Sequence, residues 1–137
     1  MSYGKIRANF IEHNSSGSVG TQYVVEGSSR AWFNFNGSGT VALSDSFNMS
    51  SVTDNATGDY TPTMSTPLGN TNYAVVVGGN LRAAGSSINL VFQVKGTTAG
   101  TPDLKTTTQC RMDGKRGGGT GALDLGTGHG SFMGDLA

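Results

Sequence analysis

Apolar and polar side chains alternate along several separate blocks of the chain. Residues 5–11, 30–36, 88–95 and 104–112 follow this alternation. A period of two is the pattern of a β-strand that turns one face toward a core. Residues 71–78 carry apolar side chains on both faces, which indicates a strand that is at least partly buried on both sides.

Clusters of Gly, Asn, Ser and Asp separate these blocks, as is typical of tight turns. The Asn-Gly-Ser-Gly sequence at 36–39 predicts a hairpin turn into a returning strand over 40–43. No window shows the apolar period of 3.6 that predicts a helix, since residues 81–84 look helical for only about one turn before Gly85. Further short strands are expected over 22–25, 47–53, 59–64 and 131–136, and loops over 14–20 and 54–58.

The pattern predicts an all-β fold, a single antiparallel β-sandwich or jelly-roll-like domain of about eight to ten short strands joined by many tight turns. We expect one domain over residues 1–137, because no linker divides the chain. Residues 1–29 are expected to form an extended N-terminal arm with strands, and residues 30–113 the β core. Residues 114–137 form a Gly-rich C-terminal segment in which 117–121 hold no regular packed element.

The composition narrows the class of protein. The chain has 22 glycines and only 13% charged residues, a composition that also occurs in disordered chains. Disorder would not produce alternating apolar blocks, so a turn-rich β-protein is favoured. Nine basic and nine acidic residues cancel, and the nearest basic cluster is Arg111, Lys115 and Arg116. This balance argues against a nucleic-acid partner.

The chain shows no signal for a membrane. No apolar run approaches the ~18 residues of a membrane span, and the N-terminus lacks the apolar core of a signal peptide. We therefore expect no membrane insertion, and synthesis and folding in a cytoplasm.

Candidate catalytic and metal-binding residues are few. The single cysteine, Cys110, cannot form an intrachain disulfide and is interpreted as a small buried apolar residue. His13 and His129 lie far from it in sequence, so no zinc motif is formed. Most acidic residues occupy turn sequences, and only a composite site between subunits stays open for a carboxylate pair. Nucleophile-elbow, phosphate-loop and calcium-loop motifs are absent, and we expect no enzyme, cofactor or metal.

Aromatic and polar turn residues are the remaining candidates for a functional surface. Trp32 and Tyr60 are suited to stacking on a sugar or an apolar partner, although core or interface packing is the more frequent use of such residues. Polar loops on a rigid β-scaffold are common recognition sites, which draws attention to 36–39, 54–58 and the region after Gly114. The candidate surface-recognition residues are Trp32, Asn36, Ser38, Asp54, Asn55 and Tyr60.

Three segments carry a family resemblance. Residues 30–42 read RAWFNFNGSGTVA, residues 46–61 read SFNMSSVTDNATGDYT and residues 72–77 read NYAVVV. In this order they resemble a module of short tail-fibre proteins of marine and freshwater bacteriophages, including cyanophages. Residues 131–135 are similar to the final strand of that module. The sequence departs from the module at Phe33, Ala56 and Pro62.

The resemblance implies a structural protein of a phage virion, made in the host cytoplasm. It implies a homo-oligomer, a trimer like most phage fibres, whose partners are other virion proteins and a glycan or protein of the host surface. The module has no residues of known catalytic role, so none is carried over to this chain.

Two structural functions stay open at this point. The first is a tail-fibre or tail-tip component that contributes to host attachment. The second is a capsid decoration (cement) protein that stabilises the phage head through an extended terminal arm. A polysaccharide depolymerase and a cellular carbohydrate-binding module are further alternatives.

Overall fold

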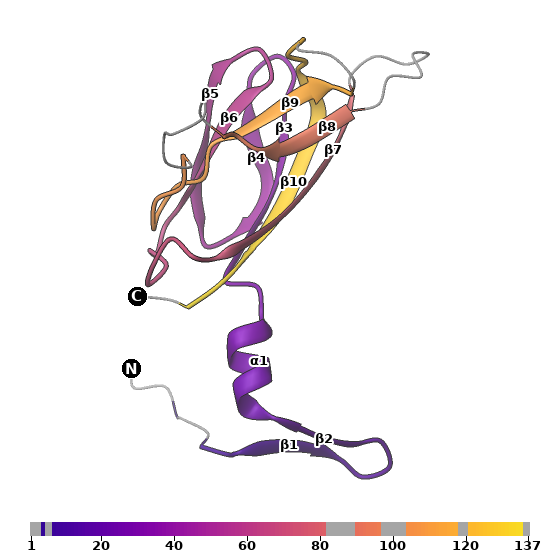
Figure 1. Ribbon diagram of the computed structural model, residues 1–137, viewed down its shortest axis with the longest axis vertical. Helices are drawn as coiled ribbons and strands as arrows, with labels where there is room; N and C mark the ends of the chain where they lie inside the picture. The colour runs from indigo at the N-terminus through magenta and orange to yellow at the C-terminus, as the bar shows by residue number, and fades with distance from the viewer. Residues whose placement is uncertain (1–3, 5–6, 82–89, 97–103, 118–120, 136–137) are drawn as a thin grey trace.

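The computed structural model describes residues 4, 7–81, 90–96, 104–117 and 121–135. Over these residues it contains one short helix and ten strands (Figure 1). The elements are β1 (Phe10–His13), β2 (Gly17–Gly20), α1 (Thr21–Gly27), β3 (Ala31–Asn36), β4 (Ala42–Phe47), β5 (Met49–Ala56), β6 (Asp59–Met64), β7 (Ala74–Leu81), β8 (Leu90–Val94), β9 (Met112–Arg116) and β10 (Leu125–Met133).

Eight strands form two four-stranded antiparallel sheets, ordered β4-β3-β10-β7 and β5-β6-β9-β8. The predicted antiparallel β-sandwich is thereby confirmed, and eight strands in two sheets is also the number found in jelly rolls. The last strand, β10, lies between β3 and β7 and is hydrogen-bonded to both (Figure 1). The chain therefore completes this sheet only when its C-terminal part is in place.

The core lies between the two sheets and is rich in aromatic rings. Phe33 contacts Phe132 with ring centroids 5.7 Å apart, and Phe35 contacts Tyr60 across the sandwich at 4.9 Å. Such pairs add favourable geometry to the burial of their area. The buried apolar side chains are Ala31, Phe33, Phe35, Tyr60, Met64, Leu68, Tyr73, Phe92, Cys110, Met112, Leu125 and Phe132.

Two glycines of β10 make room for these rings. Gly128 lies opposite Phe35 and Gly130 lies opposite Phe33 in the strand register. A Cβ at Gly128 would lie 2.3 Å from Cε1 of Phe35, and one at Gly130 would lie 2.7 Å from Cζ of Phe33. An aromatic ring that covers a cross-strand glycine is a known way to stabilise a Gly-containing strand. The glycines of this strand are therefore part of the core packing.

Several predicted strands are confirmed with small shifts. The strands expected over 30–36 and 59–64 are β3 and β6, and that expected over 88–95 contains β8. β7 begins three residues later than expected, and β4 continues to Phe47. β5 extends into the loop predicted over 54–58 as far as Ala56, so only residues 57–58 form the turn. The loop expected over 14–20 contains β2, and β1 begins later than the strand expected over 5–11. Residues 82–84, 88–89 and 118–120 lie outside the described residues.

The prediction of a strand over 22–25 is wrong, because Thr21–Gly27 forms the helix α1. Val24 and Val25 favour strands, but propensity is a weak preference that local bonding overrides. The Thr21 backbone N–H donates to the carbonyl of Asn9 at 2.9 Å, and the Thr21 hydroxyl donates to the carbonyl of Ala8 at 2.7 Å. These bonds fold the chain back at the start of the helix.

The prediction of a continuous strand over 104–112 is also wrong. Residues 104–111 form a small turn closed by isolated bridges, such as Lys105 with Cys110. The Thr106 hydroxyl accepts the backbone N–H of Thr108 at 3.2 Å and that of Gln109 at 3.0 Å. A threonine side chain that bonds backbone groups ahead of it favours a turn over an extended strand.

The C-terminal segment contains more strand than predicted. β9 runs into it as far as Arg116, and the last strand covers Leu125–Met133 instead of 131–136. Glycines at every second position hide the alternation of this strand, because they supply no apolar side chain to count. The predicted Gly-rich segment therefore supplies a central strand of one sheet.

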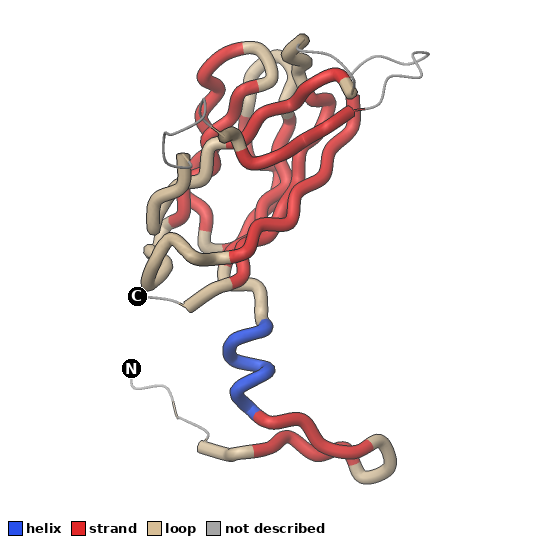
Figure 2. The backbone as a smooth tube through the Cα atoms, viewed as in Figure 1, coloured by secondary structure: helices blue, strands red, loops and turns tan. Residues whose placement is uncertain are grey.

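The N-terminal part stands away from the sandwich. β1 and β2 form a two-stranded hairpin, and α1 connects it to β3 (Figure 2). The Arg30 guanidinium donates to the carbonyl of Val25 at the end of α1 and, at 3.1 Å, to the carbonyl of Gly134 after β10. Arg30 therefore ties the helix to the sandwich. We call residues 7–27 the arm.

Candidate functional site

Three loops lie together at the end of the sandwich that is opposite the arm (Figure 1). The β3–β4 turn is bonded to the segment before β10 through the Gly37 N–H and the Gly126 carbonyl, 3.2 Å apart. The Gly58 N–H of the β5–β6 turn donates to Oδ1 of Asp124 at 2.8 Å. We call this group the distal loops, and its hydrogen bonds join both sheets.

Tyr60 lies beneath the distal loops and is fully buried, so its interpretation as a surface residue is wrong. Its hydroxyl donates to the Gly37 carbonyl at 3.0 Å and accepts the Leu125 N–H at 3.1 Å. Burial raises the pKa of Tyr60 to about 12, a rise supported by the nearby Asp124 carboxylate and opposed by the Leu125 N–H. The protonated hydroxyl positions two loops, and the buried Tyr60 side chain exposes no surface for recognition.

Asn36 and Ser38 lie in the β3–β4 turn as predicted, but their side chains bond to each other. The Asn36 amide donates to the carbonyls of Ser38 at 2.7 Å and Thr40 at 3.2 Å. Its oxygen accepts both the N–H and the hydroxyl of Ser38 at 3.2 Å. This is an Asx-type turn. The Asn36 side chain therefore stabilises the turn.

Asn55 and Asp54 lie at the end of β5. The Asn55 amide donates to Oδ1 of Asp59 at 3.2 Å and to the Thr61 hydroxyl at 2.8 Å. Asp54 is exposed and lies opposite Tyr60 in the register of β5 and β6. The structure thus brings Asn36, Ser38, Asp54 and Asn55 to the same end of the sandwich and gives the two amides mainly structural roles.

A charged cluster lies on the outer face of the second sheet. Asp59 is buried and accepts Arg111 Nε at 2.7 Å, Arg111 Nη2 at 2.8 Å, and Lys95 Nζ. Burial tends to raise the pKa of Asp59, but the bonds from Arg111 and Lys95 outweigh it and lower this pKa to about 2. Asp59 therefore stays ionised at neutral pH and lacks the raised pKa of a general acid.

Asp113 lies directly opposite Asp59 in the register of β9 and β6 and is also buried. Its Oδ2 accepts Lys115 Nζ at 2.7 Å, whereas its Oδ1 has no hydrogen-bond partner among the described residues. The two carboxylates sit among three cations, Lys95, Arg111 and Lys115, which disfavours a metal ion at this place. Across the described ranges, no group of three or more His, Cys, Asp or Glu residues is arranged to hold a metal.

Trp32 lies on the outer face of the first sheet, where it is 38% exposed. It stands opposite Phe47 of β4 on one side and Ser131 of β10 on the other, and Ser131 stands opposite Val76 of β7. Phe47 and Val76 are each 57% exposed. These four residues form a row across all four strands, and three of them expose apolar surface.

The next row on the same face is polar. Asn34 stands opposite Asp45 of β4 and His129 of β10, and His129 stands opposite Gly78 of β7. Asn34, Asp45 and His129 are all exposed. The two rows together form a surface that we call the Trp32 face. The alternation in β3 already placed Trp32 and Asn34 on one face, whereas His129 was missed because β10 was predicted too short.

A hollow of about 280 Å³ opens on the Trp32 face between β7 and β10. Gly78 forms part of its lining, and a Cβ at that position would lie 2.6 Å from Nε2 of His129. The missing side chain at Gly78 therefore leaves room for the imidazole to lie across the neighbouring strand.

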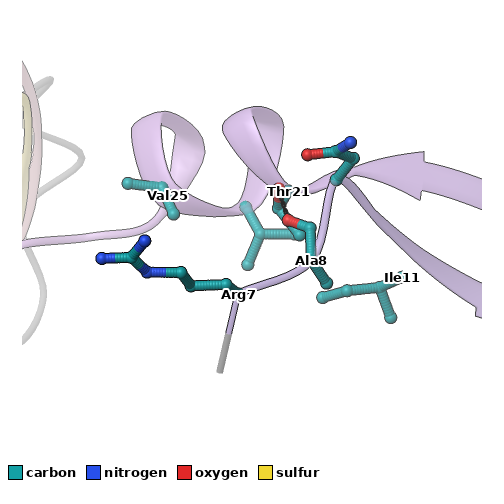
Figure 3. A pocket seen from close by; sticks show the side chains of 7 residues that line it. Arg7, Ala8, Ile11, Thr21 and Val25 are labelled. Atoms are coloured by element: carbon teal, nitrogen blue, oxygen red, sulfur yellow. Dashed lines mark hydrogen bonds between the residues drawn. The ribbon is translucent and has the colours of Figure 1, made fainter. Parts of the chain in front are cut away.

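The arm exposes a second apolar surface. The aliphatic side chains Ile11 and Val25 are 53% and 56% exposed, and no residue of α1 is buried. Figure 3 shows Arg7, Ala8 and Ile11 on one side and Thr21 and Val25 of α1 on the other. They line a groove of about 620 Å³ together with Asn9 and Val24. Residue patterns did not predict this surface.

Comparison of the chain with protein-family models, with curated proteins and with solved structures finds no match. The resemblance of residues 30–78 to phage tail-fibre proteins therefore stays a prediction. No helix among the described residues is long and apolar enough to cross a membrane.

Proposed function

We propose that the chain is a structural protein of a phage virion, a tail-fibre or tail-tip component that contributes to host attachment. The difference between the two ends of the molecule supports this function. One end is an apolar arm that stands away from the sandwich, and the other is a group of loops cross-linked by Tyr60 and Asp124 (Figure 2). An anchor at one end and a rigid display surface at the other suit an attachment protein.

The arm is too small to be stable without a partner. A single two-stranded hairpin is marginal in water, and an isolated helix shorter than about 12 residues is marginal as well. The arm is built from one four-residue pair of strands and a seven-residue helix without a buried residue. It therefore gains stability by packing against a neighbouring copy or another virion protein, and we propose a homotrimer joined in this way.

The experiment that tests this function is immunogold labelling of purified phage particles in the electron microscope. Label at the tail is the expected result. Particles without label would contradict a virion function, because a structural component stays with the particle through purification.

The arm also fits the second candidate function, a decoration protein of the capsid. In that case, label covers the head, and the arm holds the protein between capsid subunits. A double variant, Ile11→Ser with Val25→Ser, would then lose binding to heads that lack the protein. Val91→Ser is the matched control, because Val91 is 41% exposed on the sandwich and far from the arm in sequence.

A further inference from the structure

We propose that the Trp32 face binds a neutral glycan. This inference rests on the attachment function proposed above and names the class of ligand. The surface lies on regular strands of the β4-β3-β10-β7 sheet, so its side chains are held at fixed spacings (Figure 1).

The first argument is the placement of the aromatic rings. Trp32 and Phe47 are cross-strand neighbours with exposed rings, and the Cβ atoms of such neighbours are about 5 Å apart. A sugar ring has an apolar face of C–H groups that packs on an aromatic ring, while its hydroxyl groups point to the rim. Exposed Trp and Phe side chains can supply such a surface at little loss of conformational freedom.

The second argument is the row of hydrogen-bonding side chains beside the rings. Asn34 follows Trp32 by two positions on β3, about 7 Å along the strand. His129 of β10 is the cross-strand neighbour of Asn34. Within the described part of the chain, the Asn34 amide and the His129 ring make no hydrogen bond to the protein. Among the described residues, the hydrogen-bonding groups of Asn34 and His129 are therefore unused. The Asn36 and Asn55 amides differ, because they bond inside their own loops. Unused amide and imidazole groups beside an aromatic ring match the hydroxyl groups at the rim of a sugar.

The third argument is charge. Across β3, β4, β7 and β10 the only Asp, Glu, Lys or Arg is Asp45. A phosphate, a nucleic acid or an acidic polysaccharide would need Arg or Lys on this surface. Arg30, which precedes β3, lines a hollow together with Phe47, but its guanidinium donates to the carbonyls of Val25 and Gly134. The surface therefore favours an uncharged ligand, and Asp45 is available as an acceptor for its hydroxyl groups.

The shape of the surface fits a small ligand better than a protein partner. The hollow of about 280 Å³ beside His129 lies near the lower end of ligand-pocket volumes. The apolar row is one residue wide and is broken by Ser131, whereas a protein interface has a larger apolar core.

The first test uses the intrinsic fluorescence of the unmodified protein. Trp32 is the only tryptophan of the chain, so its emission reports on this face alone. The purified full chain is screened on an array of neutral, acidic and sulfated glycans, and the glycans it retains are titrated in solution. We expect a saturable change of emission, with protection from acrylamide quenching, for a neutral glycan. Retention of none, or of acidic glycans only, would overturn the proposal.

The second test uses variants and measures affinity by calorimetry with the retained glycan. We expect Trp32→Ala to weaken binding about tenfold or more, and Asn34→Ala and His129→Ala to weaken it about fivefold each. Trp32→Phe should restore part of the affinity, and its thermal melting shows whether the fold is intact. Val91→Ala is the control, because Val91 is an exposed apolar residue of β8 that lies outside both the Trp32 face and the arm. Equal binding by Trp32→Ala and the parent protein would place the ligand elsewhere.

These tests are independent of the virion experiment. Glycan binding by Trp32 without label on phage particles would leave this inference standing and would contradict the proposed function. Label at the tail together with an array that retains no neutral glycan would support the proposed function and would contradict this inference. Retention of a host surface protein that competes at Trp32 would also overturn the glycan assignment.

Discussion

At the scale of single residues, the glycines opposite the aromatic rings decide whether β10 can join its sheet. Phe35 and Phe33 fill the space above Gly128 and Gly130. The rings belong to β3, near the start of the sandwich, and the glycines belong to the last strand. Each glycine is therefore matched to one ring that lies more than ninety positions earlier in the chain.

We predict that Gly128→Ala lowers the free energy of unfolding by about 2 kcal/mol, because its Cβ would lie 2.3 Å from the Phe35 ring. Chemical denaturation measures this change. Gly121→Ala is the control, since nothing lies within 4 Å of a Cβ at Gly121. A Gly128→Ala protein as stable as this control would contradict the packing described for β10.

Asp59 gives a prediction for the dependence of stability on pH. The bonds from Arg111 and Lys95 lower its pKa in the folded protein to about 2, from the ordinary value of 3.8 for an aspartate side chain. The folded state therefore holds the ionised form more strongly, which stabilises the protein by about 2 kcal/mol above pH ~4. This stability is lost as the pH falls from about 4 to about 2. Asp59→Asn should flatten that part of the denaturation profile, and an unchanged profile in this variant would contradict the role given to Asp59.

At the scale of elements, the distal loops depend on one hydroxyl group. Tyr60 of β6 joins the β3–β4 turn to the start of β10 through Gly37 and Leu125. Both loops belong to the β4-β3-β10-β7 sheet and Tyr60 belongs to the other sheet, so these hydrogen bonds also fix how the two sheets meet at that end.

We predict that Tyr60→Phe costs about 1–3 kcal/mol of stability, because it leaves the Gly37 carbonyl and the Leu125 N–H without their buried partner. Hydrogen exchange should speed up at Leu125 before it does in the middle of β3. Tyr23→Phe, at an exposed position, is the matched control and should change neither measurement. Unchanged exchange at Leu125 in Tyr60→Phe would mean that the loops are held by other bonds.

The pattern of apolar residues was sufficient to predict the strands that have large inward side chains. β3 and β6 were predicted nearly to the residue, because Phe33, Phe35 and Tyr60 mark their buried faces. The strand predicted from the pattern over 22–25 was wrong, because this segment is part of α1. There, hydrogen bonds from Thr21 to the carbonyls of Ala8 and Asn9 override strand propensity.

For the candidate sites, too, the sequence pattern did not show which groups are hydrogen-bonded or which strands are neighbours. Turn composition predicted the distal loops, but it did not show that Asn36 bonds within its own turn, because Asx turns and recognition loops use the same residues. The polar row of the Trp32 face depends on which strands are neighbours. Asn34 and His129 come together only because β10 pairs with β3, and the alternation within one strand carries no information about pairing.

At the scale of the whole molecule, the arm, for which we propose a partner, and the distal loops, which are joined by hydrogen bonds, lie at opposite ends. Arg30 stands at the junction and bonds both α1 and the segment after β10. The direction in which the arm leaves the sandwich is therefore set by bonds to the same sheet that carries the Trp32 face.

We predict that the full chain has a mass in solution of three times the 14.1 kDa of one chain. Removal of residues 1–27 should leave a folded monomer, because the sandwich core contains no residue of the arm. Light scattering coupled to size-exclusion chromatography measures both masses. A trimer that survives this deletion would show that the sandwich and not the arm makes the contacts.

The scarcity of charge on the β4-β3-β10-β7 sheet has a consequence for the surroundings in which the protein works. Ions in solution screen exposed charges over about 8 Å at physiological ionic strength and about 3 Å at 1 M salt. A surface that carries one carboxylate, Asp45, has little for those ions to screen. Adhesion through this face would hold nearly as well in sea water as in fresh water.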